Sequence, residues 1–147
     1  MGEWDRWALE SGWAWRARLG EGSSDDLLER LVRVLGVMVH LLDEMPVSGA
    51  ICGAHVLLRR GLSPPHRRWI LAHELGHRVL HAGNILAAYD PVLKGRRDRQ
   101  ADLFAGAFLL GRVAPDATPW MLAEETGLPE ARVCWWLRWV QALYGGV

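Results

Sequence analysis

The chain has 147 residues, of which 50% are hydrophobic, and 17 basic residues balance 17 acidic ones to a formal net charge of zero. This length and apolar content suit one domain with a buried core and exclude a disordered chain. The balanced charge argues against binding to nucleic acids or anionic membranes through bulk electrostatics. The apolar runs are shorter than the ~20 residues that span a bilayer, so we expect no membrane segment.

The start of the chain and its cysteines favour a cytoplasmic location. The N-terminus is acidic and rich in tryptophan, whereas a secretory signal is basic and then apolar. Cys52 and Cys134 are too far apart in sequence for the spacing typical of a metal site. Two cysteines without such spacing suit a reducing compartment.

Residues 1–24 are expected to form a tryptophan-rich arm ahead of the main domain. Trp4, Trp7 and Trp15 share one face of a helix, and Trp13 lies off that face. Such a face packs against the core or against a partner. A third possibility is a cap peculiar to this chain, and the sequence leaves the three open.

The next segment predicts a helix followed by a small sheet. Ser24 is a suitable N-cap for a helix that ends at Gly36. Residues 37–42, 49–52 and 55–58 then form three short strands between turn-forming residues. The predicted fold class is therefore α+β, mainly helical, with a three-stranded sheet beside the helix that follows it, over residues 63–83.

The following helix, which opens at Ser63 and closes at Gly83, carries the motif His-Glu-x-x-His. His73 and His77 are four residues apart, so both project from one face and can bind one ion at roughly 2.0–2.1 Å. Glu74 stands beside the pair, where it can accept a proton from a water bound to that ion. The motif favours a zinc hydrolase over three polar residues on a solvent-facing helix surface, because the segment also has an apolar stripe.

Two histidines do not complete a catalytic zinc site, which usually has three protein ligands. His81 is a poor third ligand for the ion, because a rise of about 1.5 Å per residue separates it from His73 by roughly 12 Å. We expect His81 to support the site from behind, to line the cleft, or simply to end the helix. The third ligand must then come from another element.

A loop over residues 84–95 containing Tyr89 is expected next, and a second apolar helix begins near Arg96. Asp98 and Asp102 lie on one face of this helix. In that arrangement one carboxylate can bind a metal while the other accepts the second N–H of a ligand histidine. The alternative is that both acids offset the neighbouring arginines at the helix N-terminus.

Residues 113–147 predict a C-terminal helical extension with the outline of a helix-turn-helix. Two helices, over residues 118–125 and 129–144, flank Gly127. The second helix offers mainly two arginines and a glutamine among tryptophans. This favours packing on the core or docking of a partner over direct reading of DNA.

In combination, these segments resemble the ImmA/IrrE-type zinc metallopeptidases. The resemblance covers roughly residues 25–137. It rests on three stretches, namely Ser48-Gly49-Ala50, the run from Arg68 to His77, and Gln100-Ala101-Asp102-Leu103-Phe104-Ala105. It implies a zincin-like metallopeptidase core over residues 25–112.

The resemblance also implies the chemistry of the site. One zinc ion per chain would be held by His73, His77 and Asp98, with Asp102 orienting a histidine. Zinc would activate a water and polarise the scissile carbonyl, while Glu74 moves the proton from the water to the leaving amine. Asp98 is one methylene shorter than the Glu usual in that family, so its helix must approach more closely or tilt.

The substrate implied by the resemblance is a protein, often a helix-turn-helix repressor in mobile elements or stress regulation. Tyr89, His81 and His55 are candidate contacts for the substrate or the transition state. An extended substrate is expected to pair with the edge of the strand at residues 55–58. The alternative function is a catalytically weak or inactive regulator of this type that acts by binding protein or DNA.

Overall fold

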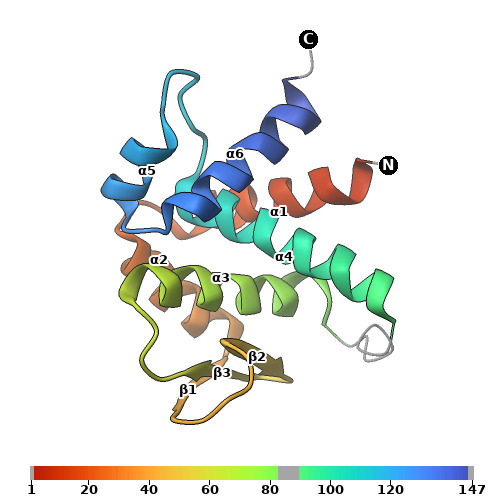
Figure 1. The fold of residues 1–147 in the computed structure, drawn as a ribbon, viewed down its shortest axis with the longest axis vertical. Helices are drawn as coiled ribbons and strands as arrows, with labels where there is room; N and C mark the ends of the chain where they lie inside the picture. Colours follow the sequence, from red (N-terminus) through yellow and green to blue (C-terminus); the bar gives the residue numbers. More distant parts are fainter. Residues whose placement is uncertain (1, 83–89, 146–147) are drawn as a thin grey trace.

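The computed structural model describes residues 2–82 and 90–145, and it confirms the predicted α+β class with mainly helical content. Helices surround α4, and the small sheet lies beyond α3 (Figure 1). In chain order the elements are α1 (Glu3–Leu19), α2 (Ser24–Leu35), β1 (Met38–Leu42), β2 (Gly49–Cys52), β3 (His55–Arg59), α3 (Pro64–Leu80), α4 (Pro91–Leu110), α5 (Pro119–Thr126) and α6 (Glu130–Tyr144).

Helix α2 begins one residue earlier than its sequence suggested. Ser23, not Ser24, is the N-cap, since its hydroxyl accepts the N–H of Asp26 and its own N–H donates to the Asp26 carboxylate. This reciprocal capping box satisfies two backbone donors at once. The hydroxyl of Ser24 instead donates to the carbonyl of Thr126 at 2.8 Å, which ties α2 to α5.

The sheet has the strand order β1-β3-β2, with β1 parallel and β2 antiparallel to β3. Val56 and Leu58 of β3 are buried in the core, which fixes the register of the central strand. Because both edges of β3 are already paired, the expectation that a substrate adds to the strand at residues 55–58 is wrong. The free edge of the antiparallel pair belongs to β2.

Helix α3 begins after Ser63, as predicted, with prolines in its first turn, and it ends at Leu80. Gly83, the predicted end, and the predicted loop contact Tyr89 lie outside the described residues. Helix α4 begins at Pro91 and not near Arg96, because the Asp90 carboxylate caps two backbone N–H groups in its first turn.

Helix α3 packs closely on α4 at a glycine. A Cβ placed on Gly76 would lie 3.1 Å from the carbonyl oxygen of Ala101 and 3.1 Å from the Phe104 ring. The absence of a side chain therefore allows the two helices to approach. This contact brings the acids of α4 within reach of the histidines of α3.

Helix α1 packs along α4 on the side away from the sheet (Figure 1). Its contact face includes the fully buried Ala8 and Leu9 and the buried Asp5, and a Cβ on Gly12 would lie only 2.6 Å from the Phe104 carbonyl oxygen. Trp4 and Trp7 of the predicted tryptophan face are 67% and 39% exposed. Bulky rings do not fit between helices that lie this close.

Helix α6 also packs on α4. The buried Trp136 donates its indole N–H to the carbonyl of Leu103 at 3.0 Å, and its ring fills the space beside Gly106. Helices α1 and α6 thus hold α4 from two sides. In the described ranges, no helix combines the length and the apolar character that crossing a membrane requires.

The close contact of α1 with α4 predicts opposite effects for one substitution at two helical glycines. Gly12→Ala should lower the free energy of unfolding by about 1–3 kcal/mol, because the new methyl group meets backbone atoms. Gly95→Ala, where nothing lies within 4 Å of an added Cβ, should raise it by up to about 1 kcal/mol through helix propensity. Urea unfolding of both variants checks this, and equal effects at the two sites would contradict the packing described.

Candidate metal centre

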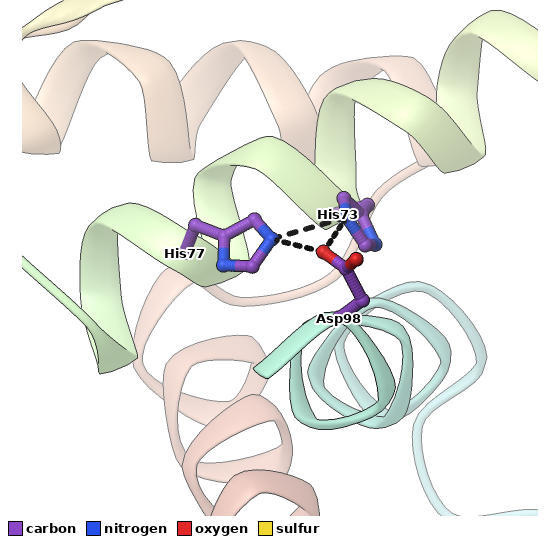
Figure 2. A group of neighbouring side chains, drawn as sticks. All are labelled: His73, His77 and Asp98. Atoms are coloured by element: carbon purple, nitrogen blue, oxygen red, sulfur yellow. Dashed lines mark hydrogen bonds and ion pairs between the residues drawn. The ribbon is translucent and has the colours of Figure 1, made fainter. Parts of the chain in front are cut away.

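The site forms where two turns of α3 face the middle of α4. His73 and His77 project from the same side of α3, with ring centroids 4.7 Å apart. Asp98 reaches toward both from α4 (Figure 2). The Oδ1 atom of Asp98 lies 3.0 Å from His77 Nε2 and 3.5 Å from His73 Nε2, and the two Nε2 atoms are 3.1 Å apart.

This donor set fits a metal ion. All three atoms carry a lone pair in the neutral imidazole and carboxylate forms, so they converge favourably only around a proton or a cation. Ligands at about 2.0–2.1 Å from a tetrahedral zinc ion stand roughly 3.3–3.4 Å apart, close to the three separations above. Among the described residues, His73, His77 and Asp98 form the group of His, Cys, Asp or Glu that could hold an ion.

Asp102 lies behind His73 and holds its ring. Its Oδ1 atom accepts the Nδ1–H of His73 at 2.8 Å and the indole N–H of Trp69, also at 2.8 Å. Arg132 of α6 approaches the other oxygen at 3.5 Å. A carboxylate in this position fixes the ring so that Nε2 faces the metal, while Trp69 and Arg132 fix the carboxylate.

His77 has a different partner behind its ring. Its Nδ1 atom lies 2.9 Å from Nδ1 of His81, and Nε2 of His81 lies 2.8 Å from Oε1 of Gln100. Both ring nitrogens of His81 are therefore engaged inside the protein rather than available to a substrate. Sequence spacing gave no sign of Gln100, because the contact depends on how His81 folds back at the end of α3.

Glu74 lies beside the group formed by His73, His77 and Asp98, in a nearly closed environment. The residue is only 6% exposed, and its carboxylate packs against the first residue of β2, since a Cβ on Gly49 would lie 3.3 Å from its Oε2 atom. Burial raises the pKa of Glu74, although His73 and His77 oppose this effect. The sheet thus shields one side of this carboxylate from water.

The neighbouring cations do not all compete for Asp98. Lys94 pairs with its Oδ2 atom at 2.8 Å, which leaves Oδ1 facing the histidines. Arg99 turns away and binds the buried Asp5 of α1 at 3.1 Å, with its guanidinium over the Trp139 ring. Burial by itself would raise the pKa of Asp98, but hydrogen bonds with both histidines and Lys94 outweigh it and hold that pKa well below its usual range.

His73 and His81 differ sharply in protonation. Burial favours the neutral form of His73, yet its hydrogen bonds to Asp102 and Asp98 outweigh that effect and raise its pKa to about 9. Burial lowers the pKa of His81 to about 4, because its bond to Gln100 offsets little of the desolvation. In the metal-free protein at neutral pH, a proton on His73 thus partly fills the role of a cation.

His55 lies elsewhere. Its Nδ1 atom is 2.9 Å from Nε2 of His40 on the neighbouring strand, and both side chains are on the exposed part of the sheet. The structure therefore gives His55 a partner on the sheet and does not bring it into the group formed by His73, His77 and Asp98.

The family model described as the IrrE N-terminal-like domain, Peptidase_M78, matches residues 33–118, which is more than half of the chain and includes α3 and α4. The chain belongs to this family. The expected resemblance is confirmed, and membership indicates a metallopeptidase-like function. A search of curated proteins gave no match. Helices α1 and α6 lie outside the matched residues.

The raised pKa of His73 predicts how the metal-free protein responds to pH. Its ion pairs contribute stability fully below the ordinary His value of 6.5, and that contribution is lost as the pH rises through about 9. With a chelator present, the free energy of unfolding should therefore fall between pH 6.5 and about 10. A His73→Gln variant should show a shallower fall in the same denaturation series, and identical slopes would contradict the assignment.

Proposed function

We propose that the protein is a zinc-dependent endopeptidase that hydrolyses a peptide bond in a protein substrate. One observation carries the proposal: three lone-pair atoms, from His73, His77 and Asp98, converge beside the buried carboxylate of Glu74. Metallopeptidases combine a metal ion with a carboxylate next to it in this way. Membership of the peptidase family supports the same reaction class.

The role proposed for Glu74 is general acid–base catalysis. When bound, zinc would supply a Lewis acid that polarises the scissile carbonyl and acidifies water. Glu74 would accept the proton of the attacking water and then pass it to the leaving amine. In the metal-free protein burial raises the pKa of Glu74, which makes its carboxylate a better proton acceptor. Burial against β2 limits competing proton exchange with bulk water.

The free edge of β2 is the proposed docking line for an extended substrate. It is the unpaired edge next to the site, since a Cβ on Gly49 would lie 2.6 Å from Ile70 Cγ2 and 3.3 Å from Glu74 Oε2 of α3. Backbone pairing along β2 would place a peptide carbonyl beside Glu74 without requiring a particular side chain, and neighbouring pockets would then give selectivity. This placement replaces the one on β3, which is paired on both sides.

The proposed substrate is a helix-turn-helix repressor of a mobile element or stress response, and its support is the family resemblance. A second candidate function is a metallopeptidase-like regulator with weak or no activity. The ion pair of Lys94 with Asp98 favours this second function, because it partly neutralises the carboxylate that would bind the metal. That side chain is also shorter than the Glu usual in the family. The variants below distinguish the two functions.

Replacing Glu74 by Gln should abolish cleavage and keep the metal. The amide retains the size of the side chain but accepts no proton, so the rate should fall at least about 10²–10⁴-fold. The test incubates the zinc-loaded wild type and Glu74→Gln with repressors encoded beside the gene and identifies new peptide ends by mass spectrometry. Cleavage that is unchanged in Glu74→Gln would refute the mechanism, and no cleavage by a zinc-loaded wild type would favour the regulator.

Substitution of either acid of α4, Asp98 or Asp102, by alanine tests which of them binds the metal. Asp98→Ala removes a ligand atom, whereas Asp102→Ala removes only the acceptor behind His73 and should cost about 10–100-fold in zinc affinity. We expect the loss in Asp98→Ala to be clearly larger, as measured by competition with a chromophoric chelator. Equal affinities of the two variants would mean that Asp98 does not bind the metal.

A further inference from the structure

The residues behind the two metal-binding histidines differ in chemical type. His73 is backed by a carboxylate, which can only accept its Nδ1–H. His77 is backed by another imidazole, which can either donate or accept. A neutral histidine binds metal through one nitrogen only, so the ring of His77 is useful only if its proton is on Nδ1. Something must therefore fix the direction of the His77–His81 hydrogen bond.

Gln100 fixes that direction. Its Oε1 atom, 2.8 Å from Nε2 of His81, can only accept a hydrogen bond, so the proton of neutral His81 must lie on Nε2. Nδ1 of His81 then has a lone pair and accepts the Nδ1–H of His77, 2.9 Å away. This leaves the lone pair of His77 on Nε2, the atom that faces His73 and Asp98.

The position of His81 explains how it can reach back. It is the residue after the last turn of α3, where the backbone leaves helical geometry while its N–H still bonds the carbonyl of His77 at 2.8 Å. Four residues along a helix place side chains on the same face. The side chain of His81 thus lies over that of His77. Gln100 of α4 is the last member of this series of hydrogen bonds.

We propose that His81 and Gln100 are positioning residues that hold His77 in the Nδ1–H tautomer and so prepare its Nε2 atom to bind the metal. This inference rests on the zinc site of the proposed function but not on catalysis. It assigns to Gln100 a role in metal affinity although it touches no metal-binding atom. It also gives His81 a role other than contact with substrate.

The test compares two replacements of His81. His81→Phe keeps a planar ring but removes both nitrogens, and we expect zinc affinity to fall about 10–100-fold. His81→Gln can still offer a carbonyl oxygen to His77 and should recover part of that loss. His66→Phe is the matched control, because it makes the same change at an exposed position in the first turn of the same helix. It should bind zinc like the wild type.

A spectroscopic measurement distinguishes a role of His81 in setting the His77 tautomer from a role in packing alone. Two-bond ¹H–¹⁵N correlation spectra of the metal-free protein report which nitrogen of His77 carries the proton. The wild type should show the proton on Nδ1, and His81→Phe should lose that preference. A His77 proton on Nε2 in the wild type, or a folded His81→Phe variant with wild-type zinc affinity, would overturn the proposal.

A second pair of variants decides the matter should His81→Phe fail to fold. Gln100→Leu removes the acceptor, whereas Gln100→Glu keeps it, so only the leucine variant should lose zinc affinity and the tautomer preference. Equal affinities in this pair would overturn the role of Gln100. A protein that passes these tests but cleaves no repressor would favour the regulator over the proposed peptidase and leave the positioning role intact.

Discussion

The contact of α3 with α4 at Gly76 is the constraint on which the site depends. A side chain at this position would meet the backbone of Ala101 and the ring of Phe104, so the helices could not lie as close as they do. Near this contact, the carboxylate of Asp98 lies within 3.0 Å of His77 and 3.5 Å of His73.

Helix α4 is in turn held by elements outside the matched family residues. Helix α1 packs along it through Gly12. The buried Asp5 of α1 also accepts a hydrogen bond from Arg99, so the guanidinium of Arg99 points away from Asp98. Helix α6 contributes Trp136 against the same helix, and its Arg132 approaches Asp102. These contacts link helices α1 and α6 to the orientation of the side chains proposed to bind the metal. We infer that the terminal helices support the site rather than only cover the core.

The parts that could be predicted from the sequence are those set by local geometry. The four-residue spacing of His73 and His77 places both rings on one face of any helix, and the α+β class and the family followed from similar local patterns. The central position of β3 could not be predicted, since strand order depends on long-range pairing. The start of α4 was missed because the Asp90 cap and its proline were interpreted as a loop. Gln100 was missed because its contact with His81 joins two helices, and residue spacing within one helix does not show which residues of another helix it meets.

The most direct test of the account is X-ray absorption at the zinc edge of the zinc-loaded protein. We predict only nitrogen and oxygen neighbours at about 2.0–2.1 Å, with the outer-shell scattering of two imidazole rings, and the loss of this signature in His77→Ala. Zinc–sulfur scattering at about 2.3 Å, from Cys52 or Cys134, would contradict it. So would a spectrum without imidazole scattering, because the ion would then lie away from His73 and His77.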